Sequence, residues 1–120
     1  MELDFEIRPW GAWYVLDQGD LYKVKRIEVE PGKRLSLQTH VHRSEHWYVV
    51  TGIVTCQIGD QERVLRQGES LVVPQGAAHR LANLHDEPLL VIEVQHGEYL
   101  GEDDICRLAD DYGRQASAET

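Results

Sequence analysis

The sequence predicts an all-β domain, folded as a sandwich or a barrel. Short runs rich in Val, Ile, Leu and Tyr recur along the chain, and turn signals that contain glycine or proline separate them. Turn signals at intervals of about 8–12 residues are typical of sandwiches and barrels. Roughly eight such strands in about 100 residues are typical of a jelly roll. Because the chain has only 120 residues, we expect one domain, residues 1–120, with its core barrel at about 20–97.

The first half of the chain begins with an aromatic-rich segment, residues 8–16, which leads into a turn at 17–20. In residues 21–29 apolar and polar side chains alternate imperfectly, which indicates a strand. One face of that strand carries Leu21, Lys23, Lys25, Ile27 and Val29. Two more strands are expected at residues 35–42, after a turn at Pro31-Gly32, and at residues 46–51, which Gly52 ends.

The second half continues with strands and then changes character. The expected strands are residues 54–60, 61–66, 70–74 and 89–95, separated by glycine turns and stopped once by Pro74. The tail from residue 98 to 115 predicts a short C-terminal helix instead. Its acidic run, Glu102-Asp103-Asp104, is placed as in a first helical turn, and Ile105, Leu108 and Tyr112 follow at helical spacing.

Composition excludes several classes of function. The net charge is −9 and the pI is about 5.0, whereas nucleic acids and anionic membranes attract basic surfaces. The two cysteines, Cys56 and Cys106, form no metal-type pair and give no sign of an oxidising compartment. The first residues lack the pattern of a signal peptide, and no apolar run approaches the roughly 18 residues of a membrane helix. We therefore expect a soluble cytoplasmic protein.

One stretch gathers most of the candidate chemistry. Gln38, His40, His42, Glu45 and His46 lie within nine residues, between two strand-like runs. Alternate residues of a strand point to one face, so Gln38, His40 and His42 would converge if this segment is a strand. Nitrogen and oxygen donors that converge in this way are what a divalent metal needs.

Two spaced motifs in this region resemble those of the cupin superfamily. Gly32, Gln38, His40, Glu45 and Gly52 fall on the spacing of the first cupin motif, with Gln38 in place of its first His. Gly68, Pro74, Gly76, His79 and Asn83 match the second motif without a gap. The resemblance implies a cupin fold, a jelly-roll barrel, and it makes His79 the best supported metal ligand.

A longer stretch, roughly residues 8–114, resembles the cupin of type II phosphomannose isomerases. In that family the cupin is often the C-terminal half of a bifunctional enzyme that also makes GDP-mannose. No nucleotide-binding loop is found here, so the resemblance implies a stand-alone isomerase domain. It implies a divalent metal, zinc before manganese, cobalt or nickel, held by Gln38, His40, Glu45 and His79. Two alternatives remain open: His42 in place of Gln38, or a set made of His40, His42 and His46.

The implied reaction interconverts mannose 6-phosphate and fructose 6-phosphate, which needs a proton carrier and a phosphate site. The candidate catalytic residues are His42, His46, Glu93 and Arg80. The candidate phosphate ligands are Arg43, Arg80 and Lys33, with Arg8 as a possible helper, because a guanidinium binds two phosphate oxygens at once. Trp10, Trp13 and Trp47 are expected in the core or in a dimer interface.

The alternatives to this enzyme come from two other classes. One is a cupin that binds a sugar phosphate without turnover, and the other is a different metal-dependent cupin enzyme such as a dioxygenase. The Gln at position 38 disfavours the usual oxygenase site, which prefers His ligands. By analogy with small cupins, which pair through their sheets, we also expect a homodimer.

Overall fold

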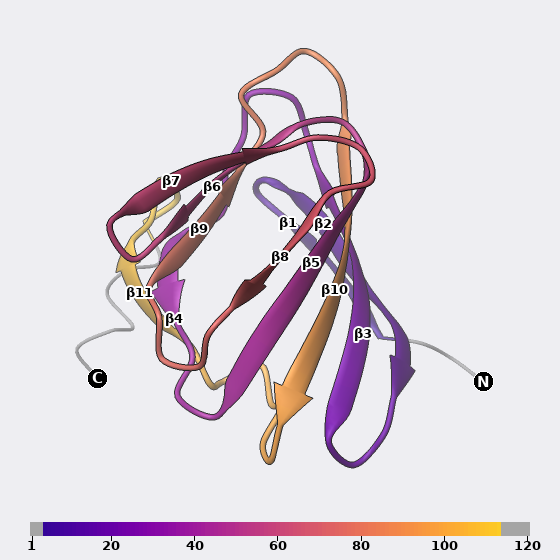
Figure 1. Ribbon diagram of the computed structural model, residues 1–120, viewed down its shortest axis with the longest axis vertical. Coiled ribbons are helices and arrows are strands. Elements are labelled where there is room, and N and C mark those ends of the chain that lie inside the picture. Colours follow the sequence, from indigo (N-terminus) through magenta and orange to yellow (C-terminus); the bar gives the residue numbers. More distant parts are fainter. Residues whose placement is uncertain (1–3, 114–120) are drawn as a thin grey trace.

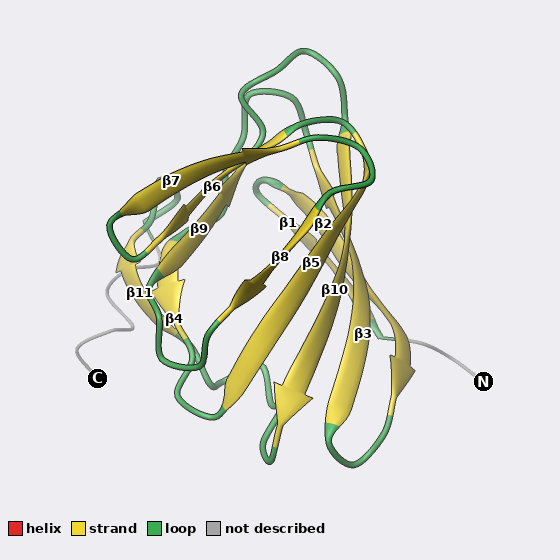
Figure 2. Ribbon diagram, in the orientation of Figure 1, coloured by secondary structure: helices red, strands yellow, loops and turns green. Residues whose placement is uncertain are grey.

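The computed structural model describes residues 4–113, and in that range the chain forms eleven strands and no helix (Figures 1 and 2). The strands are β1 (Phe5–Arg8), β2 (Gly11–Gln18), β3 (Tyr22–Val29), β4 (Leu37–Thr39), β5 (Arg43–Thr51), β6 (Val54–Ile58), β7 (Gln61–Leu65), β8 (Ser70–Val73), β9 (His79–Ala82), β10 (Leu89–Gly97) and β11 (Cys106–Ala109). The prediction of an all-β fold is confirmed. No helix in the described part of the chain is long and apolar enough to cross a membrane.

The strands form two antiparallel sheets. One has six strands in the order β1-β2-β3-β10-β5-β8, and the other has five in the order β11-β4-β9-β6-β7. Figure 1 shows the two sheets as separate layers, with the longest strands, β5 and β10, side by side in the larger one. A strand that is buried on one side alternates inward and outward residues, so each sheet lines the interior with every second side chain.

The alternation is clearest on β5. Arg43, Glu45, Trp47 and Val49 point inward and are buried, whereas His46 and Tyr48 are exposed. Towards one end of the barrel the inward positions are apolar and form the core, together with Val29, Val54, Leu81, Leu89 and Val91. Complete burial of a Val or Leu side chain stabilises the fold by roughly 1.5–3 kcal/mol. The predicted core tryptophans, Trp10, Trp13 and Trp47, are all buried in this cluster.

Two motif residues serve the fold rather than the chemistry. Gly52 has a φ of 89°, and a Cβ at this position would lie 2.8 Å from the carbonyl oxygen of Pro88. Asn83 is fully buried and donates to the carbonyl oxygens of Val29 and Glu87, at 3.1 and 2.8 Å. Gly52 therefore allows two backbone segments to approach closely, and Asn83 links the end of β3 to the segment before β10.

The predicted C-terminal helix is wrong within the described residues. Residues 98–105 form a loop, and β11 then pairs with β4, with Cys106 opposite Thr39 and Arg107 opposite Gln38. The helical spacing of the apolar residues was misleading because the open edge of β4 offers backbone hydrogen bonds to this segment. Residues 114 and 115, the last of the expected helix, lie outside the described range.

Candidate metal centre in the barrel

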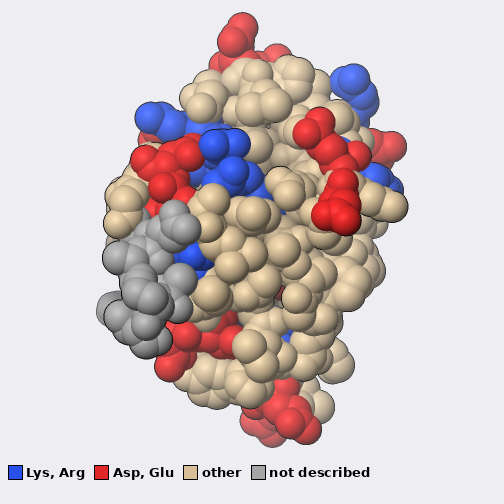
Figure 3. All heavy atoms as spheres, turned by 90° about the vertical axis from the view of Figure 1, so that its left-hand side faces the viewer, with Lys and Arg blue, Asp and Glu red and all other residues tan. Residues whose placement is uncertain are grey.

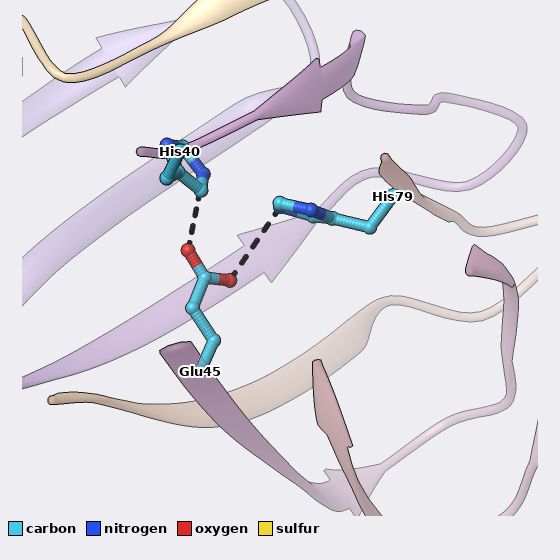
Figure 4. Close-up of side chains that lie close together, drawn as sticks. All are labelled: His40, Glu45 and His79. Carbon is cyan, nitrogen blue, oxygen red and sulfur yellow. Dashed lines mark ion pairs between the residues drawn. The ribbon is translucent and has the colours of Figure 1, made fainter. Parts of the chain in front are cut away.

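Three buried side chains converge between the sheets (Figure 4). His40 follows β4, Glu45 lies on β5, and His79 begins β9. His40 Nε2 lies 3.1 Å from Glu45 Oε2, and His79 Nε2 lies 3.7 Å from Glu45 Oε1. Each imidazole therefore faces a different oxygen of one carboxylate.

Backbone carbonyls fix the orientation of both imidazoles. His40 Nδ1 lies 2.6 Å from the carbonyl oxygen of Asp104, and His79 Nδ1 lies 3.0 Å from that of Ala77. A carbonyl oxygen only accepts hydrogen bonds, so Nδ1 must carry the hydrogen in each ring. In the neutral rings Nε2 then carries the lone pair, which is the arrangement of metal-ligating histidines.

The donor set fits a divalent metal. Two ligands about 2.1 Å from one ion stand roughly 3.4 Å apart in a tetrahedral site, and one donor atom from each of His40, Glu45 and His79 lies within 4.8 Å of the other two. Burial lowers the pKa of His79 below its usual value, which keeps that ring neutral. Burial alone would raise the pKa of Glu45, but the neighbouring His40, His79 and Arg43 hold it well below its usual value. The cluster therefore contains the neutral imidazole of His79 and the ionised carboxylate of Glu45.

Gln38 stands beside this cluster on β4, where it pairs in register with His79. Its amide Nε2 donates to Ser36 Oγ at 2.9 Å and to the carbonyl oxygen of Ser36 at 3.3 Å. Its Oε1 is therefore the atom with which the amide could act as a ligand. Gln38 lines the same pocket as His40, Glu45 and His79.

The pocket around the cluster is lined by charged and aromatic side chains from both sheets. Its polar walls include Arg8, Lys25, Gln38, Arg43, Arg80, Glu93, Glu102 and Arg107. Its apolar walls include Trp10, Trp13, Ile27, Leu35, Trp47, Leu81 and Ile105. A pocket that mixes aromatic walls with convergent polar groups is the usual form of a small-molecule site.

Glu93 is the second carboxylate of the pocket. Trp47 Nε1 donates to Glu45 Oε1 at 2.9 Å and to Glu93 Oε1 at 3.2 Å, so the indole bridges the two acids. Gln95 Nε2 donates to Glu93 Oε2 at 2.7 Å. Burial, followed by the negative charge of Glu45, raises the pKa of Glu93 to about 8. The two carboxyl groups therefore differ strongly in their affinity for a proton.

The structure does not bring the other two histidines of the motif into the pocket. His42 is exposed in the turn after β4, where its ring meets the edge of Tyr99 with 5.8 Å between centroids. His46 points outward from β5, because Glu45 and Trp47 take the inward positions on either side of it. The expected face of Gln38, His40 and His42 ends early because β4 stops at Thr39.

The predicted phosphate ligands likewise do not all lie in the pocket. Arg43, Arg80 and Arg8 line the pocket, whereas Lys33 is exposed and does not. Figure 3 shows the side of the five-stranded sheet, where Lys and Arg side chains gather next to acidic ones. Arg34 pairs with Asp111 and lies close enough to Arg80 to lower the pKa of Arg80, although burial is the larger cause of that shift.

Several polar residues of the pocket were missed in the sequence. Lys25 is buried, donates to Glu102 Oε2 at 2.6 Å and lies 4.0 Å from the ring centre of Trp13. Lys23 donates to the same oxygen at 3.3 Å. A usable signal was present, since both lysines share a strand face with Ile27 and Val29, and this face is indeed buried.

Comparison with known proteins agrees with the motifs. Residues 4–110 match the family model described as mannose-6-phosphate isomerase C-terminal. The xanthan biosynthesis protein XanB of Xanthomonas campestris is 52% identical over 107 residues, and a mannose-1-phosphate guanylyltransferase of Escherichia coli is 50% identical over 107 residues. These alignments cover 89% of this chain but only 23% and 22% of the two relatives.

Among solved structures, a cupin-2 domain from Rhodospirillum rubrum superimposes with a TM-score of 0.70 at 17% identity, over 85% of this chain and 78% of that one. This likeness concerns the fold, and the expected cupin architecture is confirmed by it. The family and the His40–Glu45–His79 cluster together indicate a divalent-metal site. The chain belongs to the mannose-6-phosphate isomerase C-terminal family, and its fold is that of a cupin.

Proposed function

We propose that this chain is a divalent-metal-dependent aldose–ketose isomerase that interconverts mannose 6-phosphate and fructose 6-phosphate. The observation that carries the proposal is the buried His40–Glu45–His79 cluster in a pocket that also holds a second carboxylate and several cationic side chains. Membership of the mannose-6-phosphate isomerase family supports the choice of substrate.

The metal, proposed to be zinc, would be held by Gln38, His40, Glu45 and His79. When bound, it supplies Lewis-acid stabilisation of the negative oxygen that develops during enolisation. The amide of Gln38 is neutral, so this ligand set carries only the one negative charge of Glu45. Manganese, cobalt and nickel accept the same nitrogen and oxygen donors.

The isomerisation moves a proton between C1 and C2, and Glu93 is the proposed carrier. It lines the pocket, and hydrogen bonds from Trp47 and Gln95 hold both of its oxygens. Burial is the largest cause that raises the pKa of Glu93 to about 8, and the charge of Glu45 is the next. A cation bound to Glu45 would offset the second of these. That pKa would then lie closer to neutrality, where a carboxylate exchanges protons efficiently. The exposed His42 and His46 are less suited to this role.

For the substrate phosphate we propose the guanidinium groups that line the pocket, Arg8, Arg80 and Arg107. Arg80 donates Nε to the carbonyl oxygen of Leu35 and Nη2 to that of Ala109, both at 3.0 Å. These two bonds hold its position, and a guanidinium has five N–H donors in all. Arg80 can therefore be anchored to the backbone and still offer donors to a phosphate.

Isomerase activity is tested by coupling conversion of mannose 6-phosphate to detection of fructose 6-phosphate. The metal-loaded chain is expected to turn over, and a chelator or the substitution His79→Ala is expected to abolish turnover. Glu93→Gln is expected to bind the metal but to lose about 100-fold or more in kcat, the usual share of a general acid–base group. His85→Ala, in a loop away from the cluster, is the matched control.

Absence of turnover in the metal-loaded protein would overturn the isomerase. If such a protein still bound mannose 6-phosphate, the second candidate, a cupin that binds a sugar phosphate without catalysis, would replace it. The same cationic pocket supports both candidates, so the assay pairs turnover with a direct binding measurement.

We also propose a cytoplasmic homodimer. The thiols of Cys56 and Cys106 are free, as is usual in a reducing compartment. The outer face of the six-stranded sheet exposes three apolar side chains: Tyr48 is 48% exposed, Val72 is 56% exposed and Val94 is 38% exposed. They lie on the neighbouring strands β10, β5 and β8 around the exposed His46, which pairs with both Val94 and Val72, and exposed apolar side chains grouped in this way favour association.

A further inference from the structure

Arg43 makes an unusual set of contacts inside the candidate metal centre. Its side chain is buried, and its Nη2 lies 2.9 Å from Glu45 Oε2 and 3.1 Å from His40 Nε2. Its Nε lies 3.0 Å from the same carboxylate oxygen. The guanidinium therefore contacts His40 Nε2 and one carboxylate oxygen of Glu45, and each of these atoms is a possible metal ligand.

The two atoms that Arg43 joins need a donor between them. The hydrogen on His40 Nδ1 is committed to the carbonyl oxygen of Asp104, so in the neutral ring Nε2 presents a lone pair. Glu45 Oε2 also presents lone pairs, and the two atoms lie only 3.1 Å apart. Two acceptors at this distance repel each other unless a donor or a cation is shared between them. The Nη2 group of Arg43 fills that role.

From this geometry we infer that Arg43 is an internal cation which competes with the divalent metal for His40 and Glu45. The lone pair of His40 Nε2 cannot both accept from Nη2 and coordinate an ion. Two positive charges at one carboxylate oxygen also repel each other strongly in a buried site. Metal binding and the Arg43 contacts are therefore mutually exclusive at these two atoms, and the metal must displace the guanidinium.

The displaced guanidinium can move into the pocket, because Arg43 itself lines the pocket. The charges of Glu93 and Glu102 act on its guanidinium in addition to that of Glu45. Metal binding would thus release the guanidinium of Arg43 from His40 and Glu45. Its positive charge would then face any molecule bound in the pocket. On the proposed function this is where an anionic sugar phosphate lies, but the exchange of cations itself does not depend on turnover.

The first test measures the affinity of the chelator-stripped full chain for Zn²⁺ and Co²⁺ by calorimetry. Arg43→Gln removes the competing charge and is expected to bind the metal about tenfold or more tightly than the original chain. Without metal, its melting temperature is expected to fall, because Glu45 loses its partner. Arg80→Gln is the matched control: it lines the same pocket but donates only to backbone carbonyls, so metal affinity should change by less than about twofold.

Equal or weaker metal binding by folded Arg43→Gln would overturn the inference. A second measurement avoids substitution altogether. In a crystal structure of the Zn²⁺-loaded chain, Arg43 Nη2 is expected more than about 3.5 Å from both His40 Nε2 and Glu45 Oε2. Retention of either contact with the metal in place would also contradict it. Both measurements are independent of isomerase activity, so failure of the proposed reaction would not be confused with failure of this exchange.

Discussion

At the residue scale, the surroundings of the two carboxyl groups in the pocket shift their pKa values in opposite directions. Glu45 is held ionised by His40, His79 and Arg43, whereas Glu93 has only amide and indole donors and lies beside the charge of Glu45. Paired acids whose environments push their pKa values apart often divide their roles in catalysis. Here one acid suits a ligand, and the other suits proton exchange.

This difference predicts how stability depends on pH in the metal-free protein. The pKa of Glu93 is raised from 4.5 to about 8 on folding, so between these values the folded state binds more protons than the unfolded state. Stability should therefore fall as the pH rises through this window. Urea denaturation at about pH 5 and about pH 8 measures the slope, and Glu93→Gln, which has no proton to lose, should flatten it. An unchanged slope in this variant would assign the effect to other groups.

The sequence predicted the convergence of His40, Glu45 and His79 better than it predicted the residues around them. His40, Glu45 and His79 occupy positions of the two motifs. The spacing of these motifs reflects a geometry that requires those residue types. His46 has the same chemistry but faces outward, because one residue of shift along a strand reverses the direction of a side chain. His42 is exposed because β4 ends at Thr39 and leaves it in a turn. Lys25 and Glu102 meet across the barrel from positions 77 residues apart, and no local pattern encodes such a pair.

At the element scale, the loop before β11 does more for the site than its exposed sequence suggests. Asp104 accepts hydrogen bonds from the backbone N–H groups of Val41 and His42, both at 2.9 Å, while its own carbonyl oxygen holds His40. Burial opposes ionisation of Asp104, but these N–H groups keep its pKa below the usual value. The loop therefore fixes the turn that delivers His40 to the barrel.

We predict that Asp104→Asn weakens both the fold and the metal centre. The amide can accept only one of the two N–H groups, and an unsatisfied donor costs about 1–3 kcal/mol. Because His40 is positioned through this turn, Zn²⁺ affinity should fall by about 10–100-fold, as measured by calorimetry. Asp103→Asn, whose carboxylate contacts the exposed Tyr99 instead, is the control. Equal metal affinity in the two variants would remove Asp104 from the site.

Strands were easier to foresee than the tail for a physical reason. Alternation on residues 21–29 and the glycine turns are local signals, and β3, β6, β7 and β10 follow them closely. The local pattern of the tail favours a helix, but its strand conformation is imposed by pairing with β4. The aromatic segment at residues 8–16 similarly contributes to β1 and β2, whose turn falls at Pro9 and Trp10.

At the scale of the whole molecule, the larger sheet has a buried face and an outer face on which apolar side chains are exposed. The proposed dimer would cover Tyr48, Val72 and Val94 on that outer face. Sedimentation velocity is expected to give twice the monomer mass for the original chain and the monomer mass for Tyr48→Glu. Val64→Glu, an exposed position on β7 of the other sheet, should leave the dimer intact. A monomeric original chain would exclude this assembly.

The ligand cluster draws on both layers of the molecule. Glu45 belongs to the six-stranded sheet, whereas His79 belongs to the five-stranded one and His40 follows a strand of it. Any cation held by all three would link the two sheets reversibly. Its binding free energy would add to the free energy of unfolding, because the unfolded chain has no such site. Metal supply would thus set the lifetime of the folded chain as well as its chemistry.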